Sequence, residues 1–273
     1  MPSSPFNTST PFAEVLERRL SRRTALRGGA ALMGGALVPT SLSARSHRST
    51  LRFPELAHRV GKDMRVARGY NADVLIRWGD SLFADSPEFN PSNPNRRAQE
   101  RQFGYNNDFI AYMPLGEGPS ASESGLLCVN HEFTTTKLMF PGLPTQGELG
   151  AAMTRAMAEV EMAAHGHSVV EVRRAEGRWT YVVDSPYNRR ITAFTPMTLT
   201  GPAASHARMR TTSDPSGQEV IGTLFNCAGG KTPWGTVLIC EEHIQFYFTG
   251  QSASERERDH HRRYGIGGDR GYT

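Results

Sequence analysis

Short apolar segments separated by turn residues are the feature that most restricts the fold of this chain. Glycine and proline, the residues of tight turns, supply 27 and 17 of its 273 residues. Repeated short strands with such turns favour an antiparallel sandwich, barrel or propeller over a parallel sheet of strand–helix–strand units. No repeat of fixed period selects one of the three. The predicted strands are residues 70–78, 109–113, 125–129, 168–173, 179–184, 190–195, 220–225 and 237–240.

One amphipathic helix is predicted within this β pattern, at residues 148–165. Leu149, Met153 and Met157 repeat at a spacing of four, which places them on one helix face. Gly166 is expected to close the helix as its C-cap. His165 and His167 then lie at the negative end of the helix dipole, and this favours a capping role over metal binding. Residues 85–107 lack apolar periodicity and are predicted to form a long surface loop.

The N-terminus is typical of an export signal. Arg22 and Arg23 precede a weakly apolar run at 25–38, and small residues follow it. That run is too short to span a bilayer, and no other segment is long enough. We predict a twin-arginine (Tat) signal at 1–44, a connector at 45–69 and a domain at 70–273. The protein is then expected to be exported by the Tat pathway to the periplasm or the extracellular space, and not to be integral to the membrane.

The charge distribution argues against a nucleic-acid partner. Residues 1–60 carry nine arginines and three glutamates, which leaves 22 basic and 24 acidic residues for the rest of the chain. A slightly acidic body has no electrostatic footprint for a phosphate backbone. The three cysteines cannot all pair with one another, so at least one is free, bound to another chain or a ligand.

Two predicted strands end in acidic residues. The strand at 125–129 leads into Asn130, His131 and Glu132, and the strand at 237–240 leads into Glu241 and Glu242. Carboxylates at the ends of buried strands are costly unless they are paired or bind a cation. Spacing alone leaves two interpretations open, a metal site or carboxylates that meet water or arginine. Oxygen ligands alone suit Ca²⁺, and oxygen with a thiolate suits a transition metal.

A glycine-rich segment lies between these two strands. Gly230, Lys231 and Thr232 resemble the end of a P-loop, but Phe225 stands where that motif needs glycine and Pro233 prevents the helix that should follow. A nucleotide-binding loop is therefore excluded. Cys227 precedes the glycines and is either a buried structural cysteine or a ligand.

Several segments resemble the PhoX family of alkaline phosphatases, in order and in register. They are residues 72–80, 103–108, 129–132, 184–192, 226–230 and 232–236 with Glu241 and Glu242. The resemblance implies a β-propeller phosphomonoester hydrolase that uses iron and calcium. For this chain it implies Cys227 as an iron ligand and Glu132, Glu241 and Glu242 as further metal ligands. Asn130, Asn226 and Arg190 become weaker candidates for contacts to phosphate or to those ligands.

The chain also departs from that family. Phe225 stands where the family commonly has asparagine, and His243 and Ile244 stand where it commonly has asparagine and phenylalanine. Family members also run on past residue 273. The resemblance therefore predicts a partial propeller with an incomplete site, and the alternative is a non-catalytic metal-binding or interaction protein of the same fold.

Overall fold

A computed structural model describes residues 55–143, 152–248, 250–251 and 254–267. The predicted signal at 1–44, the first part of the connector and residues 148–151 of the predicted helix lie outside the described residues. Contacts divide the chain into two units, Met1–Tyr70 and Asn71–Thr273. The described part of the first unit, residues 55–70, contains no helix or strand.

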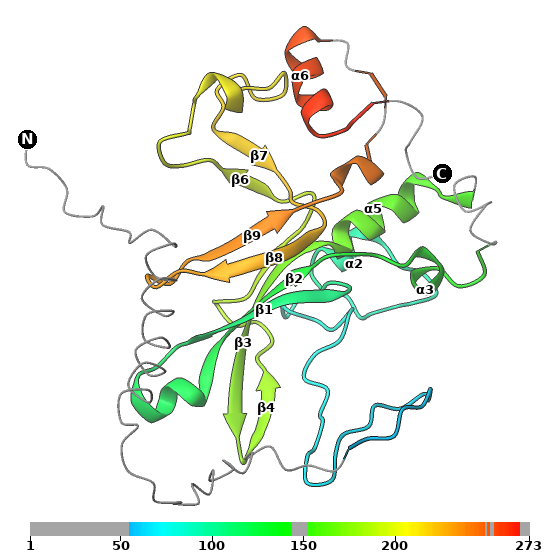
Figure 1. Cartoon of the computed structure of the whole chain (residues 1–273), viewed down its shortest axis with the longest axis vertical. Coiled ribbons are helices and arrows are strands. Elements are labelled where there is room, and N and C mark those ends of the chain that lie inside the picture. Colours follow the sequence, from blue (N-terminus) through cyan, green and yellow to red (C-terminus); the bar gives the residue numbers. More distant parts are fainter. Residues whose placement is uncertain (1–54, 144–151, 249, 252–253, 268–273) are drawn as a thin grey trace, which may run out of the picture. The chain divides into compact units, whose positions relative to one another are not determined.

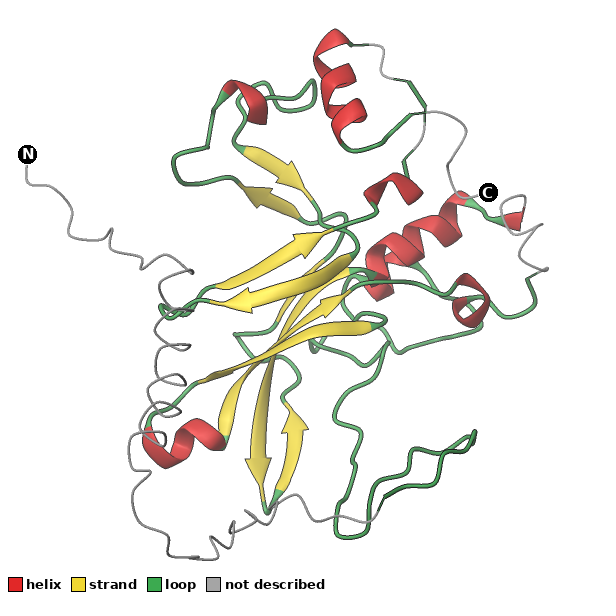
Figure 2. Cartoon of the chain, viewed as in Figure 1, coloured by secondary structure: helices red, strands yellow, loops and turns green. Residues whose placement is uncertain are grey.

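The second unit is built mainly from antiparallel strands (Figures 1 and 2). Strands β1 (Asn107–Pro114), β2 (Ser124–His131), β3 (Gly166–Ala175) and β4 (Arg178–Tyr181) follow one another in a sheet, and β5 (Arg189–Ile191) pairs with β3. Strands β6 (Pro196–Thr198) and β7 (Glu219–Ile221) form a second sheet. Strands β8 (Asn226–Lys231) and β9 (Val237–Glu241) form a third, and β8 packs against β1 and β2.

This arrangement confirms the predicted mainly β fold of antiparallel strands. A closed barrel or a propeller is not shown by the described strands, so the partial propeller stays a prediction. The predicted strand at 70–78 is wrong, because this segment has no partner strand. It is held instead by single contacts, such as the bond from Trp78 Nε1 to Gln99 Oε1 at 2.7 Å.

Helices are short and lie between the strands. They are α2 (Arg96–Gln99), α3 (Thr136–Met139), α5 (Arg155–Ala164) and α6 (Glu255–Arg263), with the 3-10 turns η1 (Gly118–Ser122), η3 (Ala207–Met209) and η4 (Ile244–Phe246). The predicted surface loop at 85–107 contains α2, which begins where Asn95 Oδ1 accepts from the Ala98 amide. None of the described helices is long and apolar enough to cross a membrane.

Helix α5 lies within the helix predicted at 148–165 but begins later, because residues 153 and 154 are described and not helical. It starts at Thr154, whose Oγ1 accepts a hydrogen bond from the Met157 amide at 3.2 Å. Its end differs from the prediction, because His165 is already extended and Gly166 opens β3 with φ +100°. A Cβ at Gly166 would lie 2.1 Å from the Ile191 carbonyl oxygen. Glycine is thus needed for close strand packing and not as a helix cap.

The buried side chains surround the end of the main sheet at which β2 stops. Leu82, Phe103, Val129 and Val170 form one cluster, and Met139, Val160 and Ala164 form another. A third cluster joins Phe225, just before β8, to neighbours that include Tyr247. These clusters hold the start of β1, the end of β2 and the start of β8, where polar residues of the three strands lie close together.

Candidate metal centre

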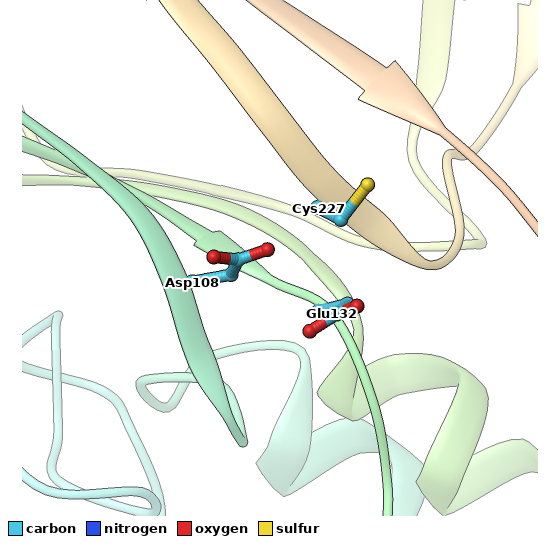
Figure 3. A group of neighbouring side chains, drawn as sticks. All are labelled: Asp108, Glu132 and Cys227. Carbon is cyan, nitrogen blue, oxygen red and sulfur yellow. The ribbon is translucent and has the colours of Figure 1, made fainter.

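Asp108, Glu132 and Cys227 form a group of potential metal ligands (Figure 3). One ligand atom from each, a carboxylate oxygen or the Sγ atom, lies within 4.8 Å of the others. Asp108 belongs to β1, Glu132 directly follows β2, and Cys227 belongs to β8. Three segments far apart in the sequence thus contribute one ligand each.

The pairing of β1 with β2 brings the two carboxylates together. Because the strands are antiparallel, the start of β1 faces the end of β2, and Asn107 pairs with His131. The register then shifts between Asn107 and Ile110. A bulge of this kind redirects a side chain. The Glu132 amide also donates to the Asn106 carbonyl at 3.0 Å, which continues the strand contact past the end of β2.

A second bulge presents Cys227. The register of β8 against β9 shifts between Asn226 and Gly229. Asn130, which is fully buried, donates from Nδ2 to the carbonyls of Cys227 and Ala228 at 3.0 and 3.1 Å. The predicted Asn130 therefore holds the backbone of Cys227. Gly229 lets β8 approach β1, because a Cβ there would lie 2.3 Å from the Phe109 ring.

Glu242 extends the acidic group. Besides burial, its charge raises the pKa of both Cys227 and Glu132, and its Oε1 lies 2.7 Å from His243 Nδ1. Burial, followed by the charges of Asp108 and Glu242, raises the pKa of Glu132. Burial, Glu242 and Glu132 likewise raise the pKa of Cys227. The anionic forms of Glu132 and Cys227 are therefore disfavoured, and a bound cation would reverse that effect.

Glu241 lies apart from this group. Its Oε1 accepts a hydrogen bond from the Leu224 amide at 2.8 Å, and its side chain is exposed. Neighbouring residues on a strand point to opposite faces, which separates Glu241 from Glu242. Of the four predicted metal ligands, Glu132 and Cys227 belong to the group with Asp108, and Glu242 is near enough for its charge to add to the effect of burial in raising the pKa of both.

Asn226 is completely buried beside Cys227. Its Nδ2 donates to Thr223 Oγ1 at 2.7 Å, while Oδ1 has no partner among the described residues. A buried amide oxygen without a donor is costly unless it faces an ion or water. Asn226 Oδ1 is thus an unsatisfied acceptor, while the carboxylates of Asp108 and Glu132 and the Cys227 thiol form the donor set that fits a cation.

Arg190 is buried and fully used by the fold. Nε donates to Gln102 O at 3.0 Å, Nη1 to the carbonyls of His167 and Ile191 at 3.4 and 2.7 Å, and Nη2 to those of Ala163 and His165 at 2.7 Å each. Guanidinium has five N–H groups, so none remains for phosphate. We assign Arg190 to the framework of the domain and do not retain it as a phosphate contact.

Three of the six described non-glycine residues with positive φ lie beside the candidate ligands. Asn106, Phe225 and His243 are non-glycine residues with positive φ, at 50°, 49° and 46°. They lie two residues before Asp108, two before Cys227 and one after Glu242. Such conformations cost roughly 1–3 kcal/mol each and persist where the surrounding structure fixes them. The strain thus marks the turns that aim the three ligands.

Three histidines that are close in sequence to the candidate centre or to α5, namely His131, His165 and His167, are buried. Burial lowers the pKa of His165 to about 3 and of His167 to about 4, and it lowers the pKa of His131 as well. His165 is therefore neutral at ordinary pH, which contradicts its predicted role as a charged helix cap. Its Nδ1 lies 2.8 Å from the Glu132 carbonyl oxygen instead, and its Nε2 lies 3.0 Å from the Tyr247 hydroxyl.

We expect the protein to lose stability steeply between pH 7 and pH 5. These histidines take up protons near pH 6.5 when unfolded but stay neutral when folded, so the unfolded state gains free energy as the pH falls. At pH 5 each contributes about 2 kcal/mol to the loss. Urea unfolding at several pH values measures it. His206→Asn, a change at an exposed histidine, should leave the slope unchanged; a flat profile for the parent protein would contradict the neutral assignment.

Asp108 is the ligand that sequence reasoning missed. It ends a segment, 103–108, that carries part of the family resemblance, but nothing in its spacing relates it to Glu132. The signal was the antiparallel pairing of 109–113 with 125–129, which places the start of the first strand beside the end of the second. The odd number of cysteines requires that at least one forms no disulfide within the chain, and Cys128, Cys227 and Cys240 are all free.

Comparison with known proteins identifies the family of the chain. A family model described as alkaline phosphatase PhoX matches residues 51–273. The chain belongs to the PhoX family. A solved structure of Pseudomonas fluorescens PhoX, in complex with vanadate, a transition state analogue, is similar at 37% identity with a TM-score of 0.62. The match covers 74% of this chain and 34% of that chain, so our sequence spans about a third of the length of that PhoX. No curated protein matches.

Proposed function

We propose that this chain provides part of the metal centre of a phosphomonoester hydrolase of the PhoX type, with iron and calcium as the metals. The observation that carries the proposal is the convergence of Asp108, Glu132 and Cys227 within 4.8 Å, at the ends of three strands. Membership of the PhoX family supports the phosphatase chemistry.

The residues present suit this chemistry. A thiolate with carboxylates favours a transition metal, and carboxylate and amide oxygens favour calcium. Cys227 would hold iron, and Glu132, Asp108 and Glu242 would supply carboxylate oxygens to the metals. Bound cations supply charge that neutralises phosphate oxygens and the leaving oxygen. Glu241 stays a weaker candidate, since its carboxylate holds the Leu224 amide.

Hydrolysis of a chromogenic phosphomonoester at alkaline pH, with iron and calcium supplied, tests the proposal. We expect turnover that a chelator abolishes and that Asp108→Asn lowers at least about tenfold, because the substitution removes a charged ligand. The matched control is Asp73→Asn, since Asp73 makes only an exposed ion pair with Arg178. Turnover that survives both the chelator and Asp108→Asn would contradict the proposed centre.

The second candidate function is metal binding without catalysis. It is favoured by one observation, that the chain spans about a third of the PhoX structure it matches. Elemental analysis of the purified protein separates the candidates when it is combined with the assay. Bound metal without turnover supports the second, and absence of both iron and calcium counts against both.

We also propose that residues 1–44 direct Tat export to the periplasm or beyond. The support is the pair Arg22 and Arg23 before a weakly apolar run, and the start of the family match at residue 51. Replacing both arginines with lysine keeps the charge but removes the guanidinium groups that a receptor reads. Cell fractionation should then find the protein retained in the cytoplasm, and export equal to that of the parent would disprove the signal.

A further inference from the structure

The peptide groups of Glu132 are fixed from two sides. Its amide donates to Asn106 O at 3.0 Å, and its carbonyl accepts from His165 Nδ1 at 2.8 Å. His165 is completely buried at the junction between α5 and β3. Glu132 follows the last residue of β2, so these two bonds replace the strand pairing that ends at His131.

The hydrogen bonds define the tautomer of His165. A carbonyl oxygen only accepts, so Nδ1 carries the proton, while the unprotonated Nε2 lies 3.0 Å from the Tyr247 hydroxyl, which donates its one proton to Glu161 Oε2. Burial lowers the pKa of His165 to about 3, which agrees with a neutral ring. The bond from Nδ1 to the Glu132 carbonyl is therefore the one whose direction is fixed.

The partners of His165 are themselves anchored. The Tyr247 hydroxyl lies 3.1 Å from Glu161 Oε2 on α5 and 3.1 Å from Thr134 Oγ1, two residues beyond Glu132. The His165 ring also packs on Phe225, with ring centroids 4.4 Å apart. Phe225 lies two residues before Cys227, so His165 touches the segments that carry two of the candidate ligands.

We propose that His165 is a positioning residue of the metal centre. Its Nδ1–H fixes the peptide of Glu132 and its ring supports Phe225, so that the Glu132 carboxylate and the Cys227 thiol face each other before any metal binds. That His165 serves a metal centre rests on the proposed function. The hydrogen bond that fixes Glu132 does not depend on it. The positioning of Glu132 depends on the N–H group at Nδ1 of His165 more than on the unprotonated Nε2.

Two isosteric substitutions separate these requirements. The amide nitrogen of asparagine reaches the position of Nδ1, whereas the longer glutamine reaches that of Nε2. Hydrogen exchange of the metal-free protein, followed by NMR at the Glu132 amide, is the first readout. Calcium affinity, measured by titration with calcium alone, is the second. The Val170 amide, in the same sheet but away from the site, is the internal reference.

We expect His165→Gln to speed exchange at Glu132 about tenfold relative to Val170, because loss of the bond to the Glu132 carbonyl loosens the segment whose amide is bonded to Asn106, and to weaken calcium binding. His165→Asn should restore both towards the parent. Tyr247→Phe, which removes only the hydroxyl, should have a smaller effect in the same direction and serves if a His165 variant does not fold. Equal exchange changes at Glu132 and Val170, or no difference between asparagine and glutamine, would overturn the proposal. If the parent binds no calcium, the proposed function fails while the exchange pattern still decides the role of His165.

Discussion

Cys227→Ala is expected to abolish iron binding and to reduce phosphomonoester hydrolysis at least about 100-fold. Cys227 supplies the only sulfur atom in the group with Asp108 and Glu132, and a thiolate is the ligand that distinguishes an iron site from a purely calcium site. Loss of an outer partner of a ligand already costs about 10- to 100-fold, so loss of the ligand itself should cost more. Elemental analysis and the chromogenic assay on the same preparation measure both effects.

Cys240→Ala is the matched control for this prediction. Cys240 lies on β9, next to the strand of Cys227, but it is exposed and belongs to no group of potential ligands among the described residues. Its variant should keep the iron content and the activity of the parent. Both variants should unfold at nearly the same temperature, since neither removes a buried side chain. If Cys227→Ala retains iron, the thiolate is not a ligand and the candidate centre must be reassigned to calcium.

The sequence predicts the strands of this protein better than their pairing. Local periodicity identifies 125–129 and 168–173 as strands because each carries its own apolar pattern. The same pattern misleads at 70–78, where no partner strand is present. Pairing is a property of distant segments, and the union of β1 with β2 is what places Asp108 beside Glu132. A ligand that depends on pairing alone could not be found by spacing.

The helix end shows a second limit. Glycine after an amphipathic run predicts a C-cap, but Gly166 opens a strand that presses against Ile191. His165 is thereby drawn into the interior, where burial removes the charge that the cap would need. Tertiary packing determines both the strand role of Gly166 and the burial of neutral His165. Neither could be inferred from the sequence of this segment alone.

Two departures from the family acquire a physical meaning in the structure. Phe225 and His243 both adopt left-handed backbone conformations, at φ 49° and 46°, and asparagine, expected at each position from the resemblance, is the non-glycine residue that tolerates this conformation best. Phe225 offsets the strain by packing its ring against His165 and Tyr247. The aromatic contact therefore stabilises the turn that precedes Cys227.

Arg190→Met is expected to lower the free energy of unfolding by at least about 3 kcal/mol, the largest loss of stability among the variants considered. Arg190 satisfies five carbonyl oxygens, from Gln102, from the end of α5, from the start of β3 and from the end of β5. Methionine has a similar length but no donor, so these carbonyls lose their partners in a buried place. Each unsatisfied group costs about 1–3 kcal/mol, and partial relaxation reduces the sum. Since a domain is stable by about 5–15 kcal/mol, urea unfolding will resolve the change.

Arg189→Met provides the comparison at the neighbouring position. Arg189 is exposed and its Nη1 donates to two nearby carbonyls at the turn, those of Pro186 and Asn188. Water can replace it there, so the loss should stay below about 1 kcal/mol. Arg190→Lys keeps the charge but offers one nitrogen in place of a planar fork, so it should fall between the two. If Arg190→Met matches Arg189→Met, the guanidinium is not the anchor of these segments, and its role as a phosphate contact becomes open again.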